Sequence, residues 1–233
     1  MKLIVFSDIH GNKYSYFQFL KKISKIEYDK VIFLGDVVGY YYSSNEIIDS
    51  MRQLNFISLL GNHDKYFLES YNNPSKLNNL TKKYGNSYRI AKKQISDANL
   101  TYLRSLEKKL EIESEGKKLF FCHGSPNDLL EGRIYPDTDL TMFDNFSLKY
   151  DYIFTGNTHH KLEKKHNKAT FLNPGSLGQQ RDGAGCSFIY IDLNLSETKF
   201  NKVNYDIEEL EKEIDKYDKG NEKIKKVLRR KQI

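Results

Sequence analysis

One pattern, which occurs five times, constrains this sequence most. An apolar run of the kind that forms a buried strand ends directly in side chains that can bind a metal ion. The residues after these runs are Asp8-Ile9-His10, Asp36, Asn62-His63-Asp64, His123-Gly124 and Asn157-Thr158-His159. In open α/β sheets, ligands bind outside the carboxyl ends of the strands. We therefore expect these five strand ends to meet and to form one site.

The order of strands and helices predicts a mixed α/β chain. Strand-like runs lie at 2–7, 30–34, 56–60, 117–122 and 151–155, and helical patterns lie at 13–25, 44–54, 64–70, 84–95, 97–106 and 138–146. Strands separated by helices favour βαβ units. Further strand-like runs favour a second, more antiparallel sheet, at 109–113, 169–172, 185–193 and 197–204. The clearest loop is 72–75, and helical patterns at 206–217 and 221–231 end the chain.

The net charge of the chain lies at one end. Residues 219–233 contain seven basic residues and one acid, whereas the rest of the chain contains 30 basic and 30 acidic residues. No linker rich in Pro, Gly or Ser divides the sequence, so we predict a single domain over 1–218 and a basic helical tail over 219–233. The neutral body argues against nucleic-acid binding. The tail could dock its apolar residues on the body, contact nucleic acid or contact an anionic membrane surface.

The apolar runs are too short for two classes of protein. None approaches the roughly 18 residues that span a membrane. The first run has four apolar residues before Asp8, which is too few for the core of a signal peptide. We therefore expect a cytoplasmic protein without a membrane span.

The side chains at the strand ends form a set of nitrogen and oxygen donors without thiolates. Four of the six histidines belong to it, namely His10, His63, His123 and His159. Each of them alone could cap a turn. Together with Asp and Asn they suit Mn, Fe, Zn or similar ions better than a closed structural zinc site. The donors are too many for one ion, so we expect two ions about 3.5–4 Å apart that share a carboxylate.

The ordered motifs resemble those of the calcineurin-like metallophosphoesterase superfamily. They are Asp8-x-His10, Gly35-Asp36, Gly61-Asn62-His63-Asp64, His123-Gly124 and Gly156-x-x-His159. The stretch Asn173-Pro174-Gly175-Ser176, with Arg181 after it, is similar to that of the YfcE-like bacterial phosphodiesterase branch. The resemblance implies a four-layer αββα sandwich, in which two packed mixed sheets are flanked by helices.

The resemblance also implies a role for each residue of the motifs. Two divalent ions, Mn or Fe with Ni, Zn or Mg as alternatives, would be held by two sets of ligands that share Asp36 as the bridge. The sets are Asp8, His10, Asp36 and His159 for one ion, and Asp36, Asn62 and His123 for the other. His63 would face the substrate and support the leaving oxygen or the phosphoryl charge. Asp64 either orients His63 or caps the helix that follows.

One metal-binding position departs from the family pattern. The family has a histidine that binds the second metal where this chain has Asn157. An amide oxygen is a weaker donor than imidazole toward transition metals. We hypothesise that the second site is weakened, and the alternative is that Asn157 binds the ion normally.

The residues around Asp36 bear on the substrate. Phosphoprotein phosphatases of the superfamily carry G-D-x-V-D-R-G, and here the second acid and the arginine are absent, which argues against that branch. Tyr40 is either an aromatic wall for a base or aryl group, or a loop residue that packs internally. Arg181 is either a clamp for a phosphate oxygen or a surface arginine.

These features predict a metal-dependent hydrolase of phosphoester or phosphoanhydride bonds in small molecules, with diesters, nucleotides and dinucleoside polyphosphates as candidate substrates. Two cations would neutralise the phosphoryl oxygens and lower the pKa of a bridging water, so that hydroxide attacks phosphorus in line with the leaving oxygen. The alternative is a non-catalytic interaction scaffold, the role in which a retromer subunit uses this fold. A third interpretation, an RNA-processing nuclease, is disfavoured by the neutral body.

Overall fold

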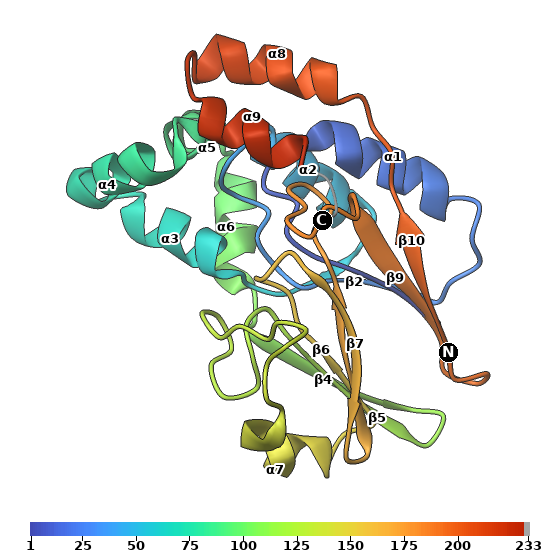
Figure 1. Ribbon diagram of the computed structural model, residues 1–233. Helices are drawn as coiled ribbons and strands as arrows, with labels where there is room; N and C mark the ends of the chain where they lie inside the picture. Colours follow the sequence, from blue (N-terminus) through green and yellow to red (C-terminus); the bar gives the residue numbers. More distant parts are fainter. Residues whose placement is uncertain (231–233) are drawn as a thin grey trace.

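Two five-stranded sheets form the framework of the protein in this computed structural model, which describes residues 1–230 (Figure 1). The strands are β1 (Lys2–Phe6), β2 (Lys30–Phe33), β3 (Ile57–Ser58), β4 (Lys109–Ser114), β5 (Lys117–Cys122), β6 (Tyr152–Phe154), β7 (Lys161–His166), β8 (Ala169–Pro174), β9 (Ser187–Asp192) and β10 (Glu197–Lys202). The first sheet has the order β10-β9-β1-β2-β3, and the second has the order β4-β5-β6-β8-β7.

The helices lie on the outer faces of the two sheets (Figure 1). They are α1 (Lys13–Ile23), α2 (Ser44–Gln53), α3 (Asn62–Ser70), α4 (Pro74–Tyr84), α5 (Ser87–Gln94), α6 (Asp97–Ser105), α7 (Asp144–Ser147), α8 (Ile207–Tyr217) and α9 (Glu222–Leu228). A 3₁₀ turn, Thr141–Phe143, precedes α7. Among these helices, α7 lies beside the second sheet, and the others lie on the side of the first sheet.

Alternation of side chains along the strands explains why the apolar runs are continuous. Leu3 and Val5 of β1 pack between the two sheets, whereas Ile4 and Phe6 pack against the helices. Strand β5 divides its side chains in the same way between the two sheets and the layer of α7. Successive residues of a strand point to opposite faces, so a strand buried on both faces is apolar throughout. The layers are therefore helix, sheet, sheet and helix, as the predicted αββα class requires.

Two of the expected strands lie in a different sheet from the one predicted. Strands β9 and β10 form an antiparallel extension of the first sheet beside β1, not part of the second sheet. The second sheet is mixed, because β5, β6 and β8 run parallel within it. A local pattern indicates that a segment is extended, but its partner strand is decided by residues far away in the sequence.

Three local features differ from those expected from the sequence. The segment predicted as a loop at 72–75 contains the start of α4, because Pro74 occupies the first turn and Asn73 caps it by accepting a hydrogen bond from the Lys76 amide at 3.1 Å. Strand β7 was not predicted because its sequence is charged, which is typical of a strand at the edge of a sheet. The helix predicted at 138–146 is reduced to the 3₁₀ turn and the short α7.

The C-terminal segment docks on the body of the protein. Helix α9 buries Ile224 and Leu228 against Tyr41 and Tyr42 and against apolar residues of α8. The end of the predicted helix 221–231 and the end of the tail lie outside the described residues. Of the helices in residues 1–230, none has the length and apolar character needed to cross a membrane. The boundary between domain and tail at 218 stays a prediction.

The loop after β8 holds the loop after β1 in place. The amide of Leu177 donates to the carbonyl of Ser7 at 2.9 Å, and the amide of Gly178 donates to that of Asp8 at 2.9 Å. A Cβ atom at Gly178 would lie 1.7 Å from the carbonyl oxygen of Ile9. Only a residue without a side chain allows the two backbones to approach so closely.

Gly178→Ala should therefore force the two loops apart. We expect the free energy of unfolding in urea to fall by about 2 kcal/mol or more, in the upper range for overpacked sites. Gly116→Ala is the control, because a Cβ atom at Gly116 would meet no other atom within 4 Å, and only the positive φ there disfavours alanine, at about 1 kcal/mol. Equal losses in the two variants would contradict the packing argument.

Candidate metal centre

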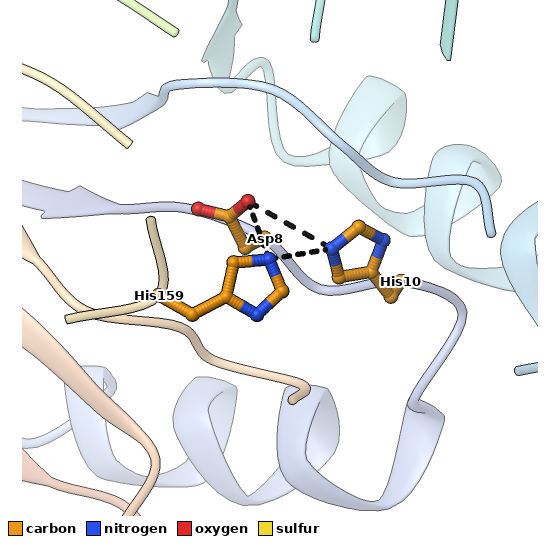
Figure 2. Close-up of side chains that lie close together, drawn as sticks. All are labelled: Asp8, His10 and His159. Atoms are coloured by element: carbon orange, nitrogen blue, oxygen red, sulfur yellow. Dashed lines mark hydrogen bonds and ion pairs between the residues drawn. The ribbon is translucent and has the colours of Figure 1, made fainter. Parts of the chain in front are cut away.

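The loops after β1, β2, β5 and β6 and the first turn of α3 meet at one edge of the two sheets. Their donor atoms form three overlapping groups in which all atoms lie within 4.8 Å of one another. The groups are Asp8, His10 and His159; His10, Asp36 and His63; and Asp8, Asp36 and His123. Figure 2 shows the side chains of the first group pointing toward one another. The five strand ends therefore lie together, as the sequence predicted.

The distances between the ring nitrogens and carboxylate oxygens of the cluster are short. The Nε2 atoms of His10 and His159 lie 3.1 Å apart, and His159 Nε2 lies 3.2 Å from Asp8 Oδ1. On the other side, His123 Nε2 lies 3.3 Å from Asp36 Oδ2. All five side chains are almost completely buried. The cluster is thus a compact set of ligand atoms removed from bulk water.

Backbone contacts determine which ring nitrogens face the cluster. The Nδ1 atoms of His10, His159 and His123 each lie within hydrogen-bond distance of a backbone carbonyl oxygen, at 3.0, 2.5 and 3.2 Å. A carbonyl oxygen only accepts, so in the neutral ring Nδ1 carries the proton and Nε2 presents a lone pair. This is the arrangement in which metal-binding histidines are oriented by a second hydrogen bond.

The arrangement of the cluster is unfavourable without a bound cation and favourable with one. Two imidazole lone pairs of His10 and His159 face each other across 3.1 Å, which is repulsive without a positive charge between them. Asp8 Oδ1 is buried and has no hydrogen-bond donor within residues 1–230. Buried polar atoms that lack a partner are rare and require an explanation such as an ion. Nitrogen and carboxylate ligands without thiolate suit Mn, Fe or Zn.

The backbone of the candidate ligands is strained. Positive φ angles between 51° and 68° occur at five of them: Asp8, His10, Asp36, Asn157 and His159. A non-glycine residue in this region costs of order 1–3 kcal/mol and persists only where its surroundings enforce it. Residues with strained backbones cluster at ligand sites. The sequence alone does not reveal this left-handed conformation.

The charges of the cluster compensate one another. Burial lowers the pKa of His10 well below its usual value. Burial also acts to lower the pKa of His123, but the adjacent Asp36 carboxylate outweighs it and raises that pKa to about 9. Burial acts to raise the pKa of Asp36, yet the imidazoles around it, His123 foremost, lower it to about 2. The carboxylate therefore keeps its negative charge and attracts a positive one, either a proton or a metal cation.

The two asparagines occupy different surroundings. Asn62 Oδ1 lies 2.9 Å from His123 Nε2, so it joins the half of the cluster that contains Asp36. The Asn157 backbone amide donates to Asp8 Oδ2 at 3.2 Å, and its side-chain amide donates to the Gly132 carbonyl at 2.9 Å. The loop at 130–132 thus holds the side-chain nitrogen of Asn157.

His63 and Asp64 have separate environments. The Nδ1 atom of His63 lies 2.7 Å from the hydroxyl of Tyr88, and burial lowers the His63 pKa to about 4. The Asp64 carboxylate instead accepts hydrogen bonds from the backbone amides of Asp36, Val38 and Gly61. Of its two predicted roles, this geometry matches the helix cap, and Asp64 also fixes the loop that carries Asp36.

Tyr40 and Arg181 lie beside the cluster. The Tyr40 ring stacks on His63 with centroids 5.2 Å apart, and Arg181 donates to the Tyr40 hydroxyl at 2.9 Å. Tyr41 and Tyr42, which continue the same run, are buried against the C-terminal helices. Of the three adjacent tyrosines, only Tyr40 therefore lines the site.

The comparison with known proteins identifies the family. A model of the calcineurin-like phosphoesterase superfamily domain matches residues 1–196. The chain belongs to this superfamily. It is 31% identical over 236 residues to an uncharacterized protein of Methanocaldococcus jannaschii, with 91% of each chain covered. The superfamily resemblance drawn from the motifs is thereby confirmed.

Solved structures share the fold of this phosphoesterase. A hypothetical protein from Pyrococcus horikoshii OT3 superposes with a TM-score of 0.87, 22% identity and 99% of both chains covered. A metallophosphoesterase from Sphaerobacter thermophilus gives a TM-score of 0.79, 23% identity and 98% coverage of both chains. YfcE, a phosphoesterase from E. coli, gives 0.53 and 17% identity over 88% of this chain and 100% of its own. At these identities, the likeness concerns the fold.

Sequence analysis missed several residues around the site. Tyr84 and Tyr88, at the end of α4 and in α5, pack against His63 with centroids 4.7 and 6.1 Å away. The loop at 130–132 holds Asn157. No local sequence motif marks these residues as part of the site. These residues can be found only from the structure, because they approach His63 and Asn157 only in the folded chain.

If the cluster binds cations, divalent metal should stabilise this phosphoesterase. After chelation, addition of Mn²⁺ at 100 times its dissociation constant should raise the free energy of unfolding by about 2.7 kcal/mol. His10→Ala should lose most of this stabilisation, as measured by the shift of the thermal midpoint. His166→Ala is the matched control, because His166 of β7 pairs with Asp144, away from the cluster. An equal shift in both variants would count against a metal site at His10.

Proposed function

We propose that the protein is a binuclear metal-dependent phosphoesterase that hydrolyses phosphoester or phosphoanhydride bonds of small molecules. One observation supports this best: buried nitrogen and oxygen lone pairs converge on one point, and a neutral imidazole, His63, lies beside them. Membership in the superfamily gives the type of reaction. The two-ion site, the small substrate and the residue roles are the proposal.

The proposal assigns the ligands to two overlapping sets. Asp36 is shared, because its Oδ2 atom lies 3.8 Å from His10 Nε2 and 3.3 Å from His123 Nε2. Asp8, His10 and His159 complete one set, and the other is completed by His123 with the two asparagines. When bound, two cations of the Mn or Fe type, or alternatively Ni, Zn or Mg, would neutralise phosphoryl oxygens and lower the pKa of a water molecule at the site.

His63 is the group that this site offers to a substrate oxygen. Burial raises the pKa of Tyr88 well above its usual value, so its hydroxyl keeps its proton and donates to His63 Nδ1. The ring proton of neutral His63 then resides on Nε2. We assign this N–H to the phosphoryl or leaving-group oxygen of the substrate, with Tyr88 as the residue that positions the ring.

Substrate enters from the side of His63. Asp8, His10 and His123 are fully buried, whereas His63 and Asn157 are each 6% exposed. Tyr40 and Arg181 flank this opening, so they are placed to contact the part of the substrate beyond the scissile bond. Such a narrow opening favours a small phosphoester over a large protein substrate.

The hydrolase is tested with bis-p-nitrophenyl phosphate and p-nitrophenyl phosphate. The chelated protein should regain turnover when Mn, Fe, Ni, Mg or Zn is added, and the preferred ester and metal are read from the rates. His63→Ala should lower kcat by about 100-fold or more while keeping the thermal shift with Mn²⁺, because the ring acts on substrate and not on metal.

His166→Ala should retain full turnover in the same assay. A folded protein that binds metal and yet hydrolyses neither ester with any ion would refute the catalytic proposal. The scaffold interpretation would then take its place.

Calorimetric titration with Mn²⁺ tests the position of Asn157. We expect two unequal binding events, with the weaker one tightened in Asn157→His, because imidazole is the better donor. Histidine also tolerates the left-handed backbone of this position, as His10 and His159 do. Two equally tight sites in the unmodified protein would show instead that Asn157 binds its ion normally.

A further inference from the structure

A basic cavity of about 370 Å³ lies beside the candidate metal centre. Its walls come from the end of α4, the loop at 133, the loop at 179–181 and helix α9. Five cationic side chains line it: Lys83, Arg133, Arg181, Lys223 and Arg230. No carboxylate is among its lining residues within 1–230.

The cavity adjoins the candidate metal centre through residues that contact both. Gln179 lines the cavity, and its carbonyl oxygen lies 2.5 Å from His159 Nδ1. Tyr40 also lines it, and the ring of Tyr40 stacks on His63. Arg181 joins the two lining residues, because it donates to the Tyr40 hydroxyl and to Gln179 Oε1. A molecule whose phosphorus lies at the candidate metal centre could therefore reach past Tyr40 toward the cavity.

Four of the basic residues between 222 and 230 fall into two sets with different surroundings. Lys225 and Arg229 face α8, where they form ion pairs with Asp215 and Glu211. Lys223 and Arg230 line the cavity, and neither pairs with a carboxylate of the chain up to residue 230. Like charges gathered in a concave site repel one another, and such a site raises the local concentration of anions. Two of these four charges are thus neutralised by α8, and the other two line the cavity.

We propose that this cavity binds a second phosphate group of the substrate, so that the enzyme acts on small phosphoesters that carry at least two phosphates. This inference rests on the proposed function, because it takes the metal centre as the place of the scissile phosphate. Lysine and arginine are the side chains that recognise phosphate by charge-assisted hydrogen bonds. In this assignment α9 is a wall of the substrate site, and its basic residues select the substrate.

The test compares nucleotides with one and with two phosphates. Adenosine 5′-monophosphate is the reference, and adenosine 3′,5′-bisphosphate and adenosine diphosphate present the second phosphate at two spacings. Dissociation constants are measured by calorimetry on the full chain, which requires no turnover, and inhibition constants are measured against hydrolysis of bis-p-nitrophenyl phosphate. We expect at least one doubly phosphorylated nucleotide to bind about tenfold or more tightly than the monophosphate.

Substitutions at the cavity wall show whether its basic residues cause the preference for a second phosphate. In the double variant Lys223→Gln, Arg230→Gln, the preference for the second phosphate should fall to within about twofold, since the charged contacts are removed. The charge-retaining variant Lys223→Arg should keep it. Lys226→Gln is the matched control on α9, because Lys226 is exposed and does not line the cavity. Circular dichroism confirms that each variant is folded.

The outcomes separate this inference from the proposed function. Binding of a doubly phosphorylated nucleotide that depends on Lys223 and Arg230 supports the cavity assignment even if no ester is hydrolysed. Metal-dependent hydrolysis with equal affinity for one and two phosphates overturns the cavity assignment and leaves the proposed function intact. Binding of a single-stranded RNA is the third outcome. The cavity assignment is also overturned if this RNA binds more tightly than either nucleotide and depends on Lys226 as much as on Lys223. An extended polyanion would then bind the face of α9 that carries Lys226, outside the cavity.

Discussion

The rest of the structure serves to hold several buried lone pairs of ring nitrogens and a carboxylate oxygen close together. The imidazole nitrogens of His10 and His159 and the Asp8 carboxylate oxygen all point to the same place, where the two imidazole lone pairs repel each other. Such an arrangement persists only if the backbone around it is fixed. The hydrogen bonds of each Nδ1 atom to a backbone carbonyl fix the rings, and the contacts of Gly178 with the β1 loop fix the backbone. The two packed sheets supply the rigidity that a strained ligand cluster requires.

Two sheets are needed because neither carries the whole cluster. Asp8 and Asp36 follow strands of the first sheet, whereas His123 and Asn157 follow strands of the second. The halves are joined by direct contacts, including that of the Asn157 amide with Asp8 Oδ2 and that of His123 Nδ1 with the Leu34 carbonyl at 3.2 Å. The apolar layer between the sheets therefore has a chemical consequence: it sets the separation of the two groups of ligand atoms.

The sequence was sufficient for the parts of the site that follow strands directly. An apolar run ending in Asp8 or His123 contains both the strand and the side chain, so their proximity followed from the fold class. The pairing of β9 and β10 with β1, the contact of Tyr88 with His63 and the basic cavity could not be predicted in this way. Each of them joins segments whose local sequences carry no sign of one another. Asp64 was ambiguous because a carboxylate at that position serves equally well as a cap or as a partner of His63, and only the positions of the surrounding amides decide between them.

The C-terminal helices and the metal centre are connected through one carboxylate. Asp218, between α8 and α9, accepts hydrogen bonds from the Tyr42 hydroxyl at 2.8 Å and from the Asn86 amide at 2.9 Å. Tyr42 lies two residues after Tyr40, and Asn86 is the N-cap residue of α5, the helix that carries Tyr88. Tyr40 and Tyr88 both contact His63, so the segments that carry them are both linked to Asp218. The side chain of Asp218 therefore ties the end of α8 to the segments that carry Tyr40 and Tyr88, two of the tyrosines that pack against His63.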